Sequence, residues 1–216
     1  MLWTLEFTVA APLADPLAAA RPLTAVPELA ALDAYTPARG EGDDPLNPAE
    51  VPPALVAILS FDDEATLRAA VAAPETAAAA PPGATSAAFR RHHYPVADGP
   101  GWPLSAPVSY LVRYDLPASD VAAFQSIYMA SHPPVQARLP GIRSILCDVP
   151  LPDLTVPGTA NANWLMGNEV VFDSAAAFAA AMRSPARHEL RAHMADFPPF
   201  SGINHHHLMD RTRITP

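Results

Sequence analysis

Two side chains four residues apart, Tyr128 and His132, could belong to one site, with His132 able to carry acid–base chemistry and Tyr128 able to bind a ligand. Residues at this spacing share one face of a helix. Pro133 follows directly and disfavours helical backbone at His132, so a kink there would aim the imidazole into a cavity. Histidine changes protonation near neutral pH, which makes His132 a candidate general acid or base. The alternative is a histidine that only caps the helix end.

Glu169 interrupts an otherwise apolar segment that we expect to be a strand over 163–172. Strand residues alternate between faces, so Glu169 would point away from Phe172 and into the molecule. A buried carboxylate needs a partner or a shifted pKa, and both are typical of proton-transfer sites. A purely structural ion pair with Arg113 or Arg143 is the equal alternative.

Three consecutive histidines, His205 to His207, lie in a further predicted strand. His205 and His207 would share a face and could polarise a substrate carbonyl. They could also bind a transition metal if a third ligand, such as His132 or Glu169, lies near. We favour a polar cavity wall and predict neither metal nor cofactor. Four further side chains are candidates for ligand binding: Tyr110, Arg113, Tyr128 and Trp164.

Composition excludes several classes of function. The chain has 216 residues and a net charge of −9, and all 13 of its basic residues are arginine. Without lysine there is no Schiff base and no P-loop. An acidic chain with scattered arginines is a poor nucleic-acid ligand. The single cysteine, Cys147, cannot form an intrachain disulfide, and we find neither a signal peptide nor a membrane span, so we expect a cytoplasmic protein.

The elements that must position these side chains occur twice. Phe61 and Phe172, Asp62 and Asp173, and Pro74 and Pro185 are each 111 residues apart. In both copies an apolar strand runs into an aspartate that can cap a following helix. Between Ala20 and Val26 the first copy has five residues, whereas the second has 14 between Phe124 and Leu139, and these carry Tyr128 and His132.

Each copy predicts the order strand, helix, strand, strand, helix, strand, which is the ferredoxin-like plan. We expect strands at 2–9, 30–37, 54–61, 85–93, 107–114, 142–149, 163–172 and 203–213. We expect helices at 15–24, 64–79, 119–138 (broken near Pro133) and 174–195. The predicted fold class is α+β: a first repeat at 1–94, a linker at 95–106 and a second repeat at 107–216. The two antiparallel sheets would pack face to face as an intrachain dimeric α/β barrel with a cavity between them; two independent domains are the alternative.

The second half resembles a known family. The pattern lies in Phe124 to His132, in Leu139-Pro140-Gly141, in Glu169 to Ser174, in Ser184-Pro185 and in Ala195-Asp196-Phe197. It looks like the EthD family of the dimeric α/β-barrel superfamily, and the first half would be a degenerate copy fused to it. The resemblance implies a barrel and a small-molecule site, and relatives include cofactor-independent monooxygenases, cyclases, dehydratases and isomerases. Haem-binding relatives carry an axial histidine on the last helix, where this chain has His188 and His193.

Two hypotheses of function follow. In the first, the chain binds a small hydrophobic molecule, cyclic or aromatic, in the barrel cavity and performs cofactor-independent dehydration, cyclisation, isomerisation or monooxygenation. His132 would move the proton, Glu169 would assist and His205 or His207 would polarise a carbonyl. In the second, the chain is a non-catalytic carrier or accessory protein of an oxidative degradation pathway. Both predict an intrachain pseudo-dimer, open to further homodimerisation, without nucleic-acid or membrane partners.

Overall fold

The strands form one closed antiparallel barrel. A computed structural model describes residues 2–40, 42–47, 50–96 and 106–214. Eight strands close the ring in the order β1-β3-β2-β9-β5-β8-β6-β4, with β4 returning to β1. A short ninth strand, β7, adds to β4 in parallel. The strands are β1 (Leu2–Val9), β2 (Ala31–Pro37), β3 (Leu55–Phe61), β4 (Thr85–Tyr94), β5 (Val108–Asp115), β6 (Ile142–Pro150), β7 (Ala160–Asn161), β8 (Trp164–Phe172) and β9 (Asn204–Ile214).

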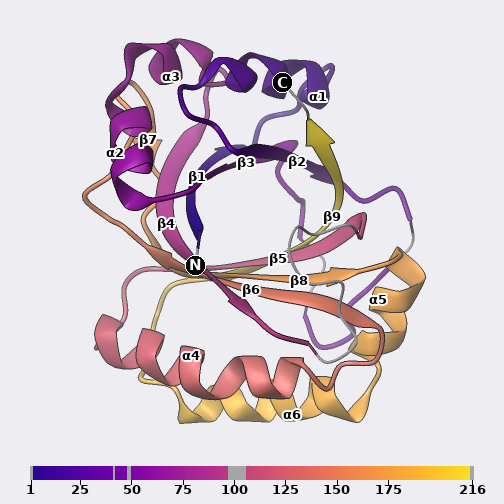
Figure 1. The fold of residues 1–216 in the computed structure, drawn as a ribbon. Coiled ribbons are helices and arrows are strands. Elements are labelled where there is room, and N and C mark those ends of the chain that lie inside the picture. The colour runs from indigo at the N-terminus through magenta and orange to yellow at the C-terminus, as the bar shows by residue number, and fades with distance from the viewer. Residues whose placement is uncertain (1, 41, 48–49, 97–105, 215–216) are drawn as a thin grey trace.

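Helices cover the outside of the ring, three from each half of the chain (Figure 1). They are α1 (Pro16–Ala20), α2 (Glu64–Ala72), α3 (Pro74–Ala79), α4 (Val121–Gln136), α5 (Ala175–Met182) and α6 (Pro185–His193), with 3₁₀ turns at Arg21–Ala25 and Met194–Asp196. The predicted fold class, an α+β dimeric α/β barrel, is confirmed. Each of the eight predicted strands overlaps an observed barrel strand. The predicted linker lies outside the described residues, apart from positions 95, 96 and 106.

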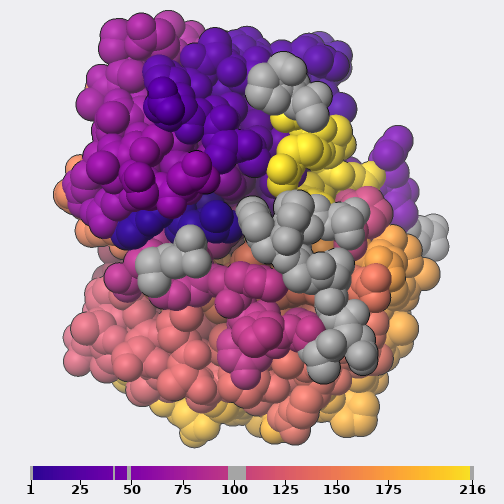
Figure 2. All heavy atoms as spheres, viewed as in Figure 1, coloured from indigo at the N-terminus to yellow at the C-terminus, as the bar shows by residue number. Residues whose placement is uncertain are grey.

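The two halves of the chain are joined along two pairs of strands, which we call seams. Each half contributes four strands with the same neighbours, β4-β1-β3-β2 in the first and β9-β5-β8-β6 in the second. The final strand of each half pairs with the second strand of the other, so that β9 pairs with β2 and β4 pairs with β6. In the space-filling view the yellow atoms of β9 lie against the indigo first half (Figure 2). The ring therefore closes only when both halves are present.

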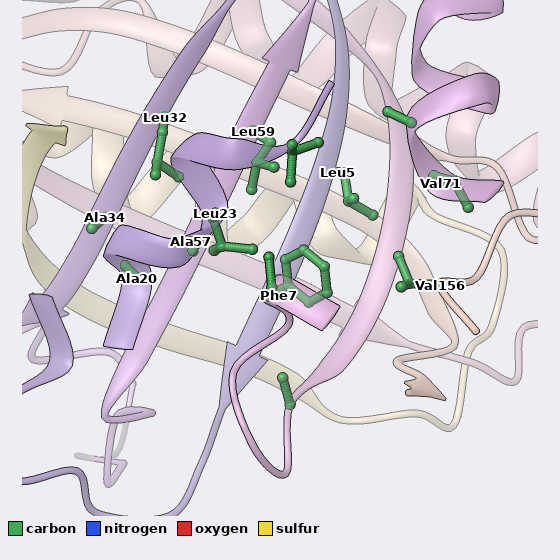
Figure 3. Packing of buried hydrophobic residues seen from close by; sticks show 14 of the residues in the cluster. Leu5, Phe7, Ala20, Leu23, Leu32, Ala34, Ala57, Leu59, Val71 and Val156 are labelled. Atoms are coloured by element: carbon green, nitrogen blue, oxygen red, sulfur yellow. The ribbon is translucent and has the colours of Figure 1, made fainter. Parts of the chain in front are cut away.

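The two helix–sheet layers differ in content. In the first half, the outward face of the sheet packs against α1, α2 and α3 through apolar side chains such as Leu5, Phe7, Leu23 and Leu59 (Figure 3). In the second half, the matching layer contains tyrosines and other aromatic side chains together with its aliphatic residues. The second layer therefore offers tyrosine and histidine side chains from which a site can be built.

Two local expectations are wrong. The helix caps are Asp63 and Ser174, one residue after the aspartates that the repeat pointed to, and each accepts a hydrogen bond from a backbone N–H of the first turn. The helix α4 is not broken near Pro133; it continues through both prolines to Gln136. Each proline lacks the N–H that would bond to the carbonyl oxygen four residues earlier, and because both lie in the last turn the disruption is confined to the end of the helix. Among the described helices, none has the length and apolar character to cross a membrane.

Candidate functional site

Paired charges fill the centre of the barrel. Glu169 is fully buried there and accepts hydrogen bonds from the Ser109 hydroxyl at 2.7 Å and the Tyr35 hydroxyl at 3.0 Å. Its ion-pair partner is Arg91, whose Nη1 lies 3.2 Å from Oε2. The predicted partners are therefore corrected. Arg113 pairs elsewhere in the barrel and Arg143 pairs with Asp173 near the surface.

The remaining central charges form one connected network. Asp148 accepts two hydrogen bonds from Arg91, at 2.7 and 2.8 Å, and lies 3.3 Å from Arg113. Arg113 also binds Glu6 through a short ion pair. Burial opposes the ionisation of Asp148, but the Arg91 guanidinium outweighs it and lowers the pKa of Asp148. A buried carboxylate with such partners is held in its charged form. The cavity expected at the centre of the barrel is thus occupied by the protein's own side chains.

Gly167 makes room for this network. It lies on β8, and a Cβ at this position would come within 2.7 Å of Nη1 of Arg113 and 3.0 Å of Cβ of Asp148. Arg113 uses the space to donate hydrogen bonds to the carbonyl oxygens of Val112 and Asn168. The close approach explains why a strand position in the middle of the sheet carries no side chain.

A second polar region lies outside the barrel, between the second-half sheet and α4 and α6. A cavity of about 50 Å³ opens there, which is room for a few water molecules. Tyr110, Tyr128 and His132 line it, as three of the sequence candidates. We call this cavity the helix–sheet pocket. Its other polar lining residues are Asn47, Tyr114, Gln136, Asn168, Arg187, Arg191, Asn204 and His206.

Two groups in the pocket have unusual surroundings. The Tyr128 hydroxyl is buried and makes no hydrogen bond within the described structure, although Tyr114 and Gln136 lie beside it. His132 stacks at 4.6 Å on the Tyr128 ring and shares a 3.3 Å hydrogen bond between its Nδ1 and that of His193. Burial, followed by the nearby His193 and Arg187, lowers the pKa of His132 to about 3. The imidazole is therefore neutral at physiological pH, and the Tyr128 hydroxyl is available to a ligand.

A segment from the first half closes the pocket. Asp44, between β2 and β3, accepts hydrogen bonds from Arg187 at 2.6 Å and from the Tyr110 hydroxyl at 3.0 Å. Asn47 donates to the same tyrosine oxygen at 3.3 Å. Beyond these contacts lies an open recess of about 410 Å³, which shares Asn47, Tyr110 and His206 with the pocket. The Asp44–Arg187 pair thus separates the pocket from the recess.

The remaining sequence candidates lie at one mouth of the barrel. His205 and His207 point inward from β9 and share an opening with Trp164 and Arg113. His205 contacts Glu50 at 3.0 Å and Asp115 at 3.3 Å. The expectation that His132, Glu169 and the histidines of β9 meet in one cavity is therefore wrong. His132 lies on a helix outside the sheet, whereas the others point to its inner side.

Sequence reasoning missed several residues that shape these regions. Asn168 lies beside Glu169 and, by alternation, faces the pocket, where it exchanges hydrogen bonds with Gln136 at 2.7 and 3.3 Å. Strand alternation alone could have found it. Asp44, Glu50 and Arg91 belong to the first half, which was expected to supply only a wall. No local pattern marks them, because their partners are distant in sequence.

Solved structures of three proteins share this fold. An "anthrone oxidase-like protein" superposes with a TM-score of 0.62 and 11% identity, over 98% of this chain and 92% of its own. A "putative monooxygenase" from Lactobacillus acidophilus NCFM superposes with a TM-score of 0.55 and 11% identity, over 99% of this chain and 95% of its own. Another "putative monooxygenase", from Fusobacterium nucleatum subsp. nucleatum, superposes with a TM-score of 0.57 and 8% identity, over 98% of this chain and 93% of its own.

These likenesses establish the dimeric α/β-barrel type of fold and, at such low identity, the fold alone. No family model matches the chain, and no curated protein is similar to it in sequence. The resemblance to the EthD family stays a prediction. Neither histidine of α6 is placed as an axial haem ligand in the described pocket, because His188 is exposed and His193 shares a hydrogen bond with His132.

Proposed function

We propose that the chain binds a small aromatic molecule with a phenol or carbonyl edge in the helix–sheet pocket and oxidises it with O₂ without a bound cofactor. The observation that carries the proposal is the buried Tyr128 hydroxyl, which has no hydrogen-bond partner among the described residues and adjoins a neutral His132. A buried polar group without a partner is costly, and a ligand oxygen would satisfy it. Aromatic walls and a few polar groups are typical of small-molecule sites.

Binding requires the pocket to enlarge. A cavity of about 150 Å³ is needed to hold a single benzene ring in an apolar core, whereas the pocket measures about 50 Å³. The adjoining recess supplies the missing room if Asp44 and Asn47 move aside. We therefore place the route of ligand access between β2 and β3, where the first half reaches over the second.

The reaction takes its electrons from the substrate. An aromatic ketone with an acidic CH₂ group would lose a proton to His132 and become an enolate, and the Tyr128 hydroxyl would donate to its oxygen. One oxygen atom of O₂ then becomes a carbonyl on the CH₂ carbon, and the other leaves as water with the two hydrogens of that carbon. The negative enolate would offset the burial that lowers the pKa of His132. The names of the structural neighbours support oxygenation for this fold.

One observation favours a second candidate, a non-catalytic carrier. A histidine whose pKa is near 3 is a weak base before the ligand arrives. In this case the pocket would hold the same class of molecule, and His132 would serve only as a hydrogen-bond partner.

Anthrone, a tricyclic ketone with an acidic CH₂ group, is the probe that separates the candidates. Air-equilibrated protein should bind anthrone and consume one O₂ for each quinone formed, and His132→Ala should abolish turnover. The matched control is His188→Ala, which removes an exposed histidine of α6. Binding without turnover would establish the carrier, and turnover unchanged in His132→Ala would refute the assigned base. Absence of binding to anthrone and to simple phenols would overturn both candidates.

We further propose that the two halves are fused copies of one EthD-like unit, with the site kept in the second. The support is the shared strand order of the halves and the greater length of two second-half helices. The helix α4 spans 16 residues where α1 spans five, and α6 spans nine where α3 spans six. Residues 107–216 expressed alone should then form a homodimer in solution. A stable monomer with a folded sheet would contradict this proposal.

A further inference from the structure

Three side chains at one mouth of the barrel converge on a point. Each of Glu50, His205 and His207 offers an oxygen or nitrogen atom, and these atoms lie within 4.8 Å of one another. We propose that they bind one divalent transition-metal ion, with Zn²⁺ as the reference case. This site is separate from the helix–sheet pocket and does not depend on the function proposed for it.

The fold brings the three ligands together from two distant segments. His205 and His207 are two residues apart on β9, so both point inward, and their rings stack at 6.0 Å with an interplanar angle of 23°. Glu50 comes from the segment between β2 and β3, 155 residues away from His205 in the chain. Strand geometry thus fixes two ligands, and the first half supplies the third.

A fourth residue orients one of the imidazoles. The carboxylate of Asp115 lies 3.3 Å from Nε2 of His205, on the opposite side of the ring from Glu50. When the Nε2 proton is donated to Asp115, the lone pair of Nδ1 points toward Glu50. Metal-binding histidines commonly donate their other N–H to a carboxylate, which fixes the tautomer.

His207 supplies the independent observation. Its Nδ1 is buried and has no hydrogen-bond partner among the described residues. The simplest metal-free explanation for the cluster is a His205 ring that hydrogen-bonds Glu50 through one nitrogen and Asp115 through the other, and it accounts for both contacts of that ring. It leaves Nδ1 of His207 without a partner among the described residues, whereas a metal ion would bind all three side chains of the cluster.

The distance between two of the three ligands fits a small first-row ion, and all three ligand atoms lie within 4.8 Å of one another. Zn–N bonds of about 2.0–2.1 Å in a tetrahedral site separate neighbouring ligand atoms by about 3.3 Å. Nδ1 of His205 lies 3.0 Å from Oε2 of Glu50, so this pair needs almost no movement. Two imidazoles and one carboxylate suit Zn²⁺, Co²⁺, Ni²⁺ or Fe²⁺ better than Mg²⁺ or Ca²⁺, which prefer oxygen ligands. Three protein ligands leave a coordination position open to water.

Calorimetric titration of the EDTA-treated full chain with ZnCl₂ tests the proposal. We expect one Zn²⁺ per chain, an affinity loss of more than about 100-fold in His207→Ala and Glu50→Gln, and a loss of about 10- to 100-fold in Asp115→Asn. The matched control is His206→Ala, which removes the histidine between the two ligands but on the other face of β9. This variant should bind Zn²⁺ with the affinity of the unmodified chain.

A Co²⁺ titration gives a second readout, because ligation by two histidines and a carboxylate produces visible absorption bands that His207→Ala should lose. Circular dichroism checks that each variant is folded, and Glu50→Gln changes a partly exposed side chain outside the strands. Absence of Zn²⁺ binding, or equal losses in His206→Ala and His207→Ala, would overturn the site. In either case the hydrogen bonds of His205 to the two carboxylates would be the explanation of the cluster.

Discussion

The barrel centre and the helix–sheet pocket lie on opposite faces of β8 and use buried polar groups in opposite ways. At the centre, Glu169 has partners on both of its oxygens, and Asp148 is held by two arginines. In the pocket, the Tyr128 hydroxyl has none, and His132 is kept neutral. Burial alone therefore does not identify a site in this protein. The satisfied groups stabilise the fold, and the unsatisfied ones are available to a ligand.

The largest effect is expected from breaking the central network. Asp148→Ala leaves Arg91 buried without its two hydrogen bonds, and removing one member of a buried ion pair costs about 3–5 kcal/mol. Urea denaturation measures the loss. The control is Asp173→Ala, whose pair with Arg143 is exposed and should contribute no more than about 1 kcal/mol. Equal losses in the two variants would contradict a structural role for the centre.

A pair of tyrosine variants compares the two regions directly. Tyr35→Phe removes a buried hydroxyl that donates to the Glu169 carboxylate, which should cost about 1–3 kcal/mol. Tyr128→Phe removes a buried hydroxyl without a partner among the described residues, which relieves a desolvation cost of about 1–3 kcal/mol, so this variant should be no less stable than the unmodified chain while binding the ligand more weakly. Thermal and urea unfolding of both variants give the comparison. If Tyr128→Phe lost as much stability as Tyr35→Phe, the two regions would not differ in how they use buried hydroxyl groups.

Gly167→Ala should disturb the centre by a smaller steric effect. The added methyl group meets the Arg113 guanidinium and Asp148, and overpacking of this kind costs about 1–3 kcal/mol. Because the Arg113 side chain can shift, we expect the lower part of this range. Urea denaturation measures the cost, and an unchanged midpoint would show that the network tolerates the methyl group.

The smallest effect is expected from the pH dependence of the pocket. A histidine whose pKa is lowered in the folded state binds its proton more readily when unfolded, so stability falls as the pH drops from about 6.5 toward 3. Between pH 6.5 and 5.5 the contribution of His132 to this loss should be about 1 kcal/mol, and His132→Phe should remove that contribution. Urea midpoints across this range provide the measurement, with His188→Ala as the control. A variant as acid-sensitive as the unmodified chain would place the titrating group elsewhere, for instance at His206.

The sequence was sufficient for the elements and for the strand plan. Periodicity located all eight barrel strands, and the 111-residue offset predicted the ferredoxin-like order of each half. The extra residues in the second half correctly indicated where the helices lengthen, and the pocket lies beneath those helices. These features are local or repetitive, and both kinds of signal are visible in a single chain.

The grouping of the candidate residues could not be predicted. Whether Glu169 meets His132 depends on which face of β8 each approaches, and α4 covers the outer face. The partners Arg91, Asp44 and Glu50 come from the first half, and nothing in their neighbourhoods marks them. Pairing across the seams joins residues far apart in sequence, so the identity of each partner emerges only from the closed barrel.

The pairing of β2 with β9 has a consequence for the synthesis of the protein on the ribosome. Asp33 on β2 accepts a hydrogen bond from Arg213 on β9, which lies 180 residues later in the chain. Until β9 emerges, β2 has an unpaired edge, and such edges invite association with other chains. Because β9 also carries His205, His206 and His207, a partly synthesised chain lacks both the recess wall and the proposed metal ligands. Assembly of the ring and acquisition of any activity therefore coincide in time.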